Sequence, residues 1–277
     1  MLLHAAHDTH PATRRTDGYV GFSSLRVGHR GGATAIVLGT YFLARRVLPD
    51  GTDVDRTHDV AGSVAFRIAA LHGLILGLVY AQELSDYKDV RSALIEEAIA
   101  ITDVYNDIWR YGGAEVGPVQ AGLKRYISTV IDDEWSMLGR TEGLSPHAWK
   151  EWEAVYEALL NLTPTTNRER WLGDRMLGRI TDIAKLREMR EAGVFGRFSS
   201  LFWAPAIAGL VLLSVPFHVY RPTRGHLVLL ATFGVYSGIV LFFIYAFSNP
   251  FRPPGRLEPV AFERLLSGDL DGKLPPR

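Results

Sequence analysis

The sequence contains no cysteine and carries no net charge. The missing cysteines exclude disulfides, thiolate metal sites and cysteine nucleophiles, and they leave the cellular compartment undecided. Thirty basic residues balance thirty acidic ones over 277 residues, so the overall charge favours neither nucleic acid nor an anionic surface as a partner. Any electrostatic signal therefore lies in how the charges are distributed along the chain.

Motifs of catalysis and metal binding are also missing. The glycines form no phosphate loop, and the chain has neither a G-x-S-x-G elbow nor the histidine-carboxylate spacing of a hydrolytic metal site. His4, His7 and His10 have a spacing that suits a metal, but they lie in residues 1–30, which we interpret as a disordered leader. The acidic run "IDDEW", Ile131–Trp135, lacks the pattern of a calcium loop and predicts a solvated helix face. We therefore expect no enzyme activity, no metal site and no cofactor.

Long apolar runs, by contrast, are prominent. Phe198–Phe217 and Leu227–Phe247 each have about the twenty residues that a helix needs to cross about 30 Å of hydrocarbon. Their short connection predicts a membrane hairpin. Val60–Gln82 is a third run, of 23 residues, and it includes the ionisable residues Arg67 and His72.

A shorter run, Gly31–Ala44, has only 14 residues. Its length lies between that of a crossing helix and that of a core or interfacial helix, although the flanking arginines can snorkel outward. Counting it as a crossing, we predict an all-α integral membrane protein with four transmembrane helices in two pairs, residues 31–84 and 198–247. A helical domain, 85–197, is inserted between the pairs, and 248–277 form a tail.

The inserted domain shows helical periodicity and no sustained strand-like alternation. Its first helix has no proline between it and the preceding apolar run, so we expect one helix to continue through both. Ser145 is a good N-cap for a later helix. Glu96 and Glu97 adjoin an apolar helix face, so partial burial of one of them is an alternative, and exposure is the default expectation. The predicted helices are 60–111, 116–138, 146–160 and 167–192.

Lysine and arginine near the ends of the apolar runs predict the orientation. They are more frequent on the side of residues 85–197 than on the opposite side. Because cytoplasmic loops carry the excess of basic residues, we expect the inserted domain and both termini to be cytoplasmic, in a multi-pass protein of a bacterial inner membrane.

The run Val60–Gln82 has an aliphatic stripe. Projected at 100° per residue, Leu71, Ile75 and Leu78 cluster on one side, with Leu74 at the edge. The stripe either lines an apolar constriction in a symmetric assembly or packs on neighbouring spans. His72 points elsewhere, and we expect it to be a packed histidine with satisfied nitrogens.

Three segments in order resemble the bacterial bestrophin-like family, catalogued as a domain of unknown function. They are residues 66–111, the stretch "YISTVIDDEWSMLGRTEG" and the closing "NPFRPPGRLEPVAFERLL", so the resemblance covers about residues 60–266. The positions that carry the resemblance are Tyr87, Arg91, Glu97, Glu134, Trp135, Pro250 and Phe251.

The resemblance implies a fold and a function. Bestrophins have a two-plus-two arrangement of spans and form pentameric ion channels whose second span lines the pore with an apolar neck. When the family's pattern is carried over to this chain, the resemblance implies that the neck falls on Leu71, Leu74 and Leu78, with Ile75 beside them. The implied partners are a lipid bilayer and further copies of the chain, as a pentamer, with no nucleic acid.

The chain has "YKDVR" where bestrophins carry a tryptophan pair, and it lacks a counterpart of their calcium clasp. The alternative is a non-conducting membrane scaffold whose cytoplasmic helices recruit a partner.

The end of the last apolar run has a strong helix stop. Proline lacks an amide donor and disfavours a helical residue before it, so the helix is expected to end at Asn249-Pro250. We expect Pro253–Pro259 to be extended and Val260–Leu266 to dock as a short helix on the inserted domain.

Overall fold

A computed structural model describes residues 18–48, 54–195 and 203–269, and within these ranges every regular element is a helix, with no strand. This confirms the all-α class. The elements are α1 (Gly18–Val47), α2 (Val54–Tyr111), α3 (Val116–Thr129), the π-helical η1 (Val130–Glu134), α4 (Trp135–Gly139), α5 (Pro146–Leu160), α6 (Asn167–Phe195), α7 (Trp203–Ser214), the 3₁₀ turn η3 (Val215–Val219), α8 (Arg224–Phe247), α9 (Val260–Arg264) and the π-helical η4 (Leu265–Asp269).

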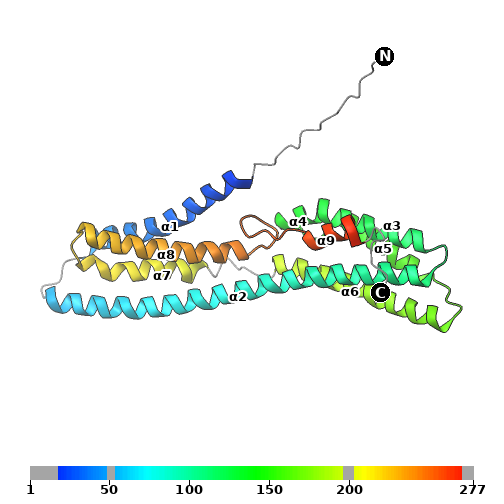
Figure 1. Cartoon of the computed structure of the whole chain (residues 1–277). Helices are drawn as coiled ribbons and strands as arrows, with labels where there is room; N and C mark the ends of the chain where they lie inside the picture. The colour runs from blue at the N-terminus through cyan, green and yellow to red at the C-terminus, as the bar shows by residue number, and fades with distance from the viewer. Residues whose placement is uncertain (1–17, 49–53, 196–202, 270–277) are drawn as a thin grey trace, which may run out of the picture.

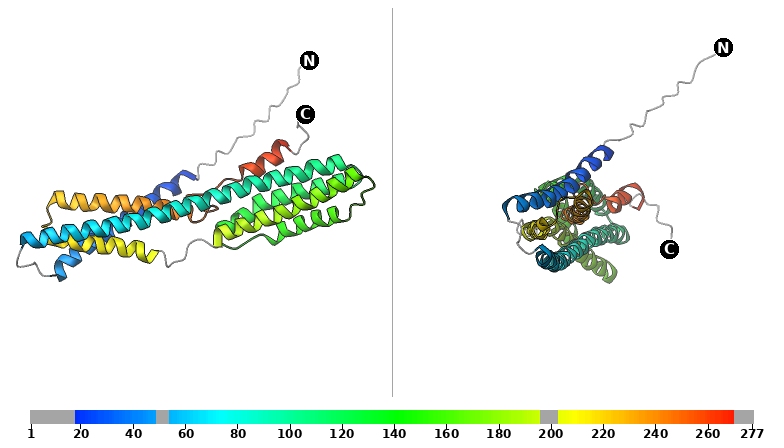
Figure 2. Two further views of the ribbon diagram at one scale, coloured as in Figure 1. Left: turned by 90° about the horizontal axis from the view of Figure 1, so that it is seen from below. Right: turned by 90° about the vertical axis from the view of Figure 1, so that its left-hand side faces the viewer.

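Helix α2 runs the length of the molecule and belongs to two bundles. It has 58 residues, or about 87 Å at 1.5 Å per residue. Its first half packs with α7, η3 and α8, and its second half packs with α3, α6 and α9 (Figures 1 and 2). The prediction of one helix through residues 60–111 is confirmed. The helix ends where Gly112 and Gly113 adopt φ of +83° and +88°, a conformation that favours glycine.

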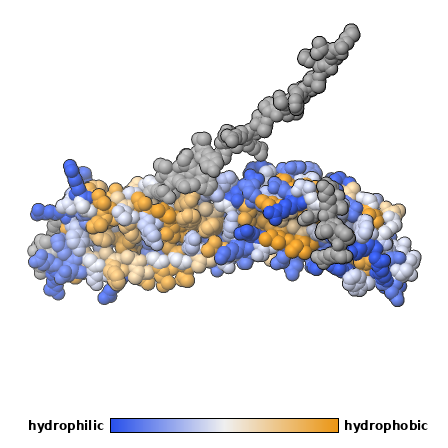
Figure 3. All heavy atoms as spheres, in the orientation of Figure 1, coloured by the Kyte–Doolittle hydropathy of each residue, from blue (hydrophilic) through white to orange (hydrophobic). Residues whose placement is uncertain are grey.

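The first bundle contains the apolar helices. By length and composition, α2 and α8 could cross a membrane, whereas Trp203–Val219 is a shorter apolar helix. Apolar residues form a broad band over this half of the molecule, with polar residues at its outer end (Figure 3). Helix α1 begins at Gly18, so it takes in part of the stretch that we interpreted as a leader. Residues 1–17, with the three histidines of that stretch, lie outside the described ranges.

Close backbone contacts and a separate core hold the first bundle together. A Cβ atom on Gly234 of α8 would lie 2.7 Å from Cα of Thr34 in α1, so only glycine permits this approach. Val37, Leu76 and Leu210 bring α1, α2 and α7 into one buried cluster. This core is distinct from the core of the second bundle.

The second bundle confirms most of the predicted helix boundaries. Helix α5 spans the predicted residues 146–160, and the Ser145 side chain accepts a hydrogen bond from the Ala148 amide at 3.4 Å. The predicted helix 116–138 is interrupted by the π-helical turn η1, which the apolar pattern did not reveal. A π-turn inserts one extra residue per turn and so changes which side chains point inward afterwards.

The C-terminal segment returns to the second bundle. Helix α9 contacts α2, and Phe262 is fully buried in the core, so the predicted docking is confirmed. The connection is less extended than expected, because residues 253–255 turn and only 256–259 lack a turn or helix.

Candidate functional site

The predicted aliphatic stripe lies on the surface of the chain. Leu71, Leu74 and Leu78, here called the leucine stripe, are each 60–63% exposed, and Ile75 beside them is 39% exposed. Another side of α2 faces the core, where Leu76 is buried. Among the described residues, no helix of the same chain covers the leucine stripe, so it does not pack on the neighbouring spans of its own chain.

The exposed line continues beyond the apolar run. At 100° per residue, Ala81, Ser85, Ser92 and Ile99 all lie within about 20° of the direction of Leu74. All four are exposed, although the last two belong to the second bundle. We call this line the open face of α2; its members are Arg67, Leu71, Leu74, Leu78, Ala81, Ser85, Ser92 and Ile99.

Arg67 is the charged residue at the start of the open face. It is exposed and lies about 20° from Leu74 around the helix. In the part of the chain that the structure describes, no hydrogen bond or ion pair reaches its guanidinium. The sequence has no acidic residue between Asp59 and Glu83, so no near neighbour on α2 neutralises it.

His72 lies on the buried side of α2 and packs tightly on α7. The side chain is 4% exposed, and a Cβ atom on Gly209 would fall 1.9 Å from its Nδ1 atom. Neither ring nitrogen has a hydrogen-bond partner among the described residues. The prediction of a packed histidine is confirmed, but the expectation that its nitrogens are satisfied is wrong.

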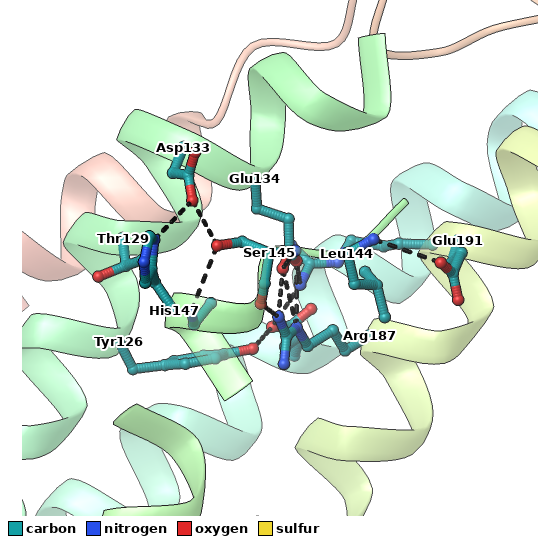
Figure 4. A network of polar contacts seen from close by, with 12 residues as sticks. Tyr126, Thr129, Asp133, Glu134, Leu144, Ser145, His147, Arg187 and Glu191 are labelled. Atoms are coloured by element: carbon teal, nitrogen blue, oxygen red, sulfur yellow. Dashed lines mark hydrogen bonds and ion pairs between the residues drawn. The ribbon is translucent and has the colours of Figure 1, made fainter. Parts of the chain in front are cut away.

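The second bundle contains a buried network of charged groups around Glu134 (Figure 4). The Arg187 Nε atom donates to both carboxylate oxygens of Glu134, at 3.1 and 3.0 Å, and its Nη2 atom contacts the same carboxylate. Arg190 Nη2 donates to Glu134 at 2.8 Å, and the Ser145 amide donates at 2.9 Å. Glu134 and both arginines are 0% exposed.

Glu97 joins the same network from α2. Its carboxylate accepts a hydrogen bond from the Tyr126 hydroxyl at 2.6 Å and lies 3.3 Å from Arg190 Nη2. Burial raises the pKa of Glu97, and the opposing effects of Arg190 and Tyr126 do not cancel this rise. Burial and the neighbouring Glu97 also raise the pKa of Tyr126 well above its ordinary value. The network thus joins α2, α3, the end of η1, the start of α5 and α6.

Burial of these acids corrects two predictions. Glu97 is fully buried although we expected exposure, and Glu134 is fully buried although "IDDEW" predicted a solvated face. Asp132 in the same run is exposed, as predicted. The cause is pairing with Arg187 and Arg190, which come more than fifty positions later than Glu134 in the chain.

One sequence signal pointed to the two arginines. Ile180, Ile183, Arg187 and Arg190 follow one another at spacings of three and four, the repeat of a buried helix face, and all four are buried. Arg187 also stacks 4.3 Å from the ring of Trp149. Two arginines on the buried face of a helix require buried carboxylates as partners. We did not use this signal in the sequence.

Most of the family-motif positions come together beside this network. The Trp135 indole donates to the Leu257 carbonyl at 2.9 Å and meets the Phe251 ring edge-on at 5.1 Å. The Asn249 side chain donates to the Leu138 carbonyl at 3.3 Å, and Pro250 beside it is buried. The closing motif is therefore a clasp that fixes the end of α8 to α4.

Two motif positions lie apart from the network. Tyr87 stacks obliquely on Phe247, with ring centroids 5.2 Å apart, where α2 leaves the apolar half of the molecule. Arg91, one helical turn later, is exposed. Over residues 18–48, 54–195 and 203–269, no cluster of three or more histidine or acidic side chains could hold a metal ion.

The fold is that of an all-helical protein with apolar helices of membrane length. A family model described as the bestrophin-like domain matches residues 31–262, so the chain belongs to the bestrophin-like family. No curated protein matches the chain.

Proposed function

We propose that the chain is a subunit of an oligomeric, passive ion channel that crosses a bacterial inner membrane four times. The open face of α2 lines the axis of the assembly, and the leucine stripe, with Ile75 beside it, forms an apolar neck. The observation that carries this proposal is the 60–63% exposure of three leucines on a helix of membrane length. No turnover chemistry is involved, because an apolar constriction gates by excluding water.

Four crossings are supported by how the apolar helices pack. Helix α8 lies along α1, and α7 with η3 lies along α2, so all four share one bundle (Figure 1). On the face seen in Figure 3, apolar residues form a broad band over this bundle, polar residues lie at its outer end, and polar residues surround a smaller apolar patch on the second bundle. The distribution of lysine and arginine then orients the second bundle and both termini toward the cytoplasm.

The length of the open face supports a second copy of the chain as its partner. Lipid can cover the leucine stripe, but it cannot cover Ile99, which lies beyond the apolar half and is 54% exposed. Further copies arranged around an axis can cover or enclose both regions at once. A pentamer is the assembly that the family resemblance implies.

The buried network serves this function by holding α2 rigid. Glu97 anchors the second half of α2 to Arg190 of α6, and α6 leads toward α7 in the membrane bundle. Glu134 adds α5 to the same anchor through the Ser145 amide. We interpret these groups as structural, because they are fully buried.

A membrane scaffold is the second candidate, and one observation favours it. Trp109 and Trp171, in the second bundle, are 70% and 60% exposed. Tryptophan is enriched at protein interfaces, so this end of the bundle suits a protein partner. A scaffold requires no conduction.

Ion flux from liposomes that contain the purified oligomer separates the two candidates. We expect the wild-type protein to release trapped ions, and Leu74→Ala and Leu78→Ala to release them faster because they widen the neck. Leu229→Ala is the matched control, since Leu229 is a 71% exposed leucine on α8. A verified oligomer that shows no flux in any variant would contradict the channel.

A further inference from the structure

We propose that the outer end of the first bundle contains a pH-sensitive latch. Protonation of His226 releases the turn between α7 and α8, residues 215–223 and here called the outer turn, from α1 and α2. This inference goes beyond the proposed function and does not require conduction, because it concerns how the helices of one chain are held together. The latch consists of Tyr41, Arg45, His58, Val219, Tyr220 and His226.

Two side chains of α1 hold the outer turn by its backbone. The Tyr41 hydroxyl donates to the Tyr220 carbonyl at 2.8 Å, and Arg45 Nη1 donates to the same oxygen at 2.9 Å. Arg45 Nη1 also donates to the His218 carbonyl at 3.2 Å. Tyr41 is 0% exposed, so its hydroxyl is shielded from water. These hydrogen bonds fix the end of η3 to the end of α1.

The start of α2 holds the same turn through a reciprocal pair of hydrogen bonds. His58 Nε2 donates to the Val219 carbonyl at 3.1 Å, and the Tyr220 hydroxyl donates to the His58 carbonyl at 3.1 Å. The rings of His58 and Tyr220 stack with their centroids 4.7 Å apart. The outer turn therefore cannot leave α2 without losing both hydrogen bonds and the ring contact.

His226, in the first turn of α8, packs among the aromatic rings of this end. Its ring centroid lies 5.5 Å from those of Tyr41 and Tyr220 and 5.9 Å from that of Phe217. The Nε2 atom of His226 is buried and has no hydrogen-bond partner among the described residues. In the imidazolium form this nitrogen carries an N–H group and the ring carries a positive charge. Burying such a group without a partner is costly, and attraction to the neighbouring rings offsets only part of the cost.

The charges near His226 give a protonated ring little compensation. Arg45 binds the carbonyl of Tyr220, whose ring packs against His226, so a second positive charge on His226 is repelled. Asp55 and Asp59 are exposed, and no ion pair joins either acid to His226 in the part of the chain that the structure describes. The other charged or titratable side chains of this end are Arg46 of α1, Arg56 and His58 of α2, His218 of η3, Arg221 of the outer turn and Arg224 of α8.

Histidine suits a switch of this kind because imidazole changes its charge between about pH 5 and 8. In the proposed orientation the outer turn faces the surroundings of the cell, so an acid medium reaches it directly. At neutral pH the uncharged ring of His226 packs in the latch. In acid the charged ring favours separation of α8 from α1, and the outer turn is released.

Hydrogen–deuterium exchange of the full-length protein in detergent tests the inference. Protection of the amides in residues 215–223 is compared at about pH 7.5 and about pH 5.5, after correction for the exchange rates of the unfolded chain at each pH. We expect protection of the outer turn to fall several-fold in acid. Helix α5, in the second bundle, is the internal control and should keep its protection.

Two variants assign the effect to His226. His226→Phe keeps a ring in the same packing but cannot be protonated, so the outer turn should keep its protection in acid. His226→Gln is also neutral and serves if the phenylalanine variant does not fold. His218→Phe is the matched control, because it removes another histidine next to the same turn and should leave the loss of protection unchanged.

Three results would overturn the latch. The first is a wild-type outer turn that keeps its protection in acid, and the second is an equal loss in α5, which would indicate general unfolding. The third is a loss in His226→Phe and His226→Gln as large as in the wild-type protein. None of these results bears on conduction, and a chain that carries no ions can still show the predicted exchange.

Discussion

Glu134 and Arg187 form an ion pair in which both side chains are 0% exposed, although 53 positions separate them in the sequence. The pair joins the end of the π-helical turn η1 to the C-terminal third of α6. Arg190 and the Ser145 amide complete the coordination of the carboxylate. Glu97 of α2 joins the same network through Arg190, so we expect the pair to help hold α2 in the second bundle.

Replacing one partner of the pair should destabilise the protein severely. Glu134→Gln leaves Arg187 buried without its counter-charge, and breaking a buried pair in this way costs about 3–5 kcal/mol of the free energy of unfolding. Thermal unfolding of the purified protein in detergent measures the effect. Glu142→Gln, which removes an exposed partner of Arg140, is the control and should change stability far less. Equal effects of the two substitutions would show that the buried pair does not anchor the bundle.

The raised pKa of Glu97 predicts how the stability of the protein changes with pH. Because burial raises the pKa in the folded state, the fold favours the protonated carboxyl. Full stability of the folded state is present below the pKa that Glu97 has in the unfolded chain. Part of this stability is lost as pH rises toward the higher pKa that Glu97 has in the folded protein. Glu97→Gln, which is always neutral, should therefore gain stability relative to the wild-type protein as pH rises above about 4.5.

The measurement for Glu97 is the unfolding temperature of both proteins across the acidic range. Glu96→Gln is the matched control, because Glu96 is an exposed glutamate next to Glu97 on the same helix. A difference between wild type and Glu97→Gln that stays constant with pH would contradict the role of burial.

Gly139 should be essential to the clasp between α4 and the closing motif. A Cβ atom at this position would lie 2.8 Å from the Phe251 carbonyl oxygen, so Gly139→Ala must displace the motif. We expect a loss of about 1–3 kcal/mol, the cost typical of overpacking. Gly178→Ala is the control, because no atom lies within 4 Å of the added carbon and alanine favours a helix. Equal stability of the two variants would show that the motif is not clasped to α4.

The contact between Gly209 and His72 predicts that removing the His72 ring restores stability lost in Gly209→Ala. Gly209→Ala would place a methyl group 1.9 Å from the His72 ring and should separate α7 from α2. His72→Ala removes the ring, so the double variant should be more stable than Gly209→Ala alone, a coupling that a double-mutant cycle measures. Gly73→Ala on α2 meets nothing within 4 Å and should be tolerated. Additive effects of the two substitutions would contradict the direct contact.

The local helix signals were the predictable part of the fold. The serine N-cap and first-turn proline fixed the start of α5, and the glycine pair fixed the end of α2, because each acts through its own backbone. The unbroken course of α2 followed from the lack of a proline between its two halves. The start of α1 at Gly18 had no sustained apolar repeat to mark it.

The buried network was largely not predictable from local pattern. The π-turn η1 changes the helical phase just before Glu134 and Trp135, so an α-helical projection places them wrongly. Charged residues are also exposed by default, and only their long-range pairing overturns this. The family resemblance identified Glu97, Glu134 and Trp135 as important positions, but it did not identify Tyr126, Arg187 or Arg190 as their partners.

The central claim is that the open face of α2 lines a conducting path, and thiol block of Leu78→Cys tests it most directly. Because the chain has no cysteine, a bulky water-soluble thiol reagent can act only at the introduced residue. We predict that it reacts with Leu78→Cys and abolishes ion flux through the liposome-reconstituted oligomer, while wild type and Leu229→Cys conduct unchanged. Flux that persists after complete modification of Leu78→Cys would contradict the account.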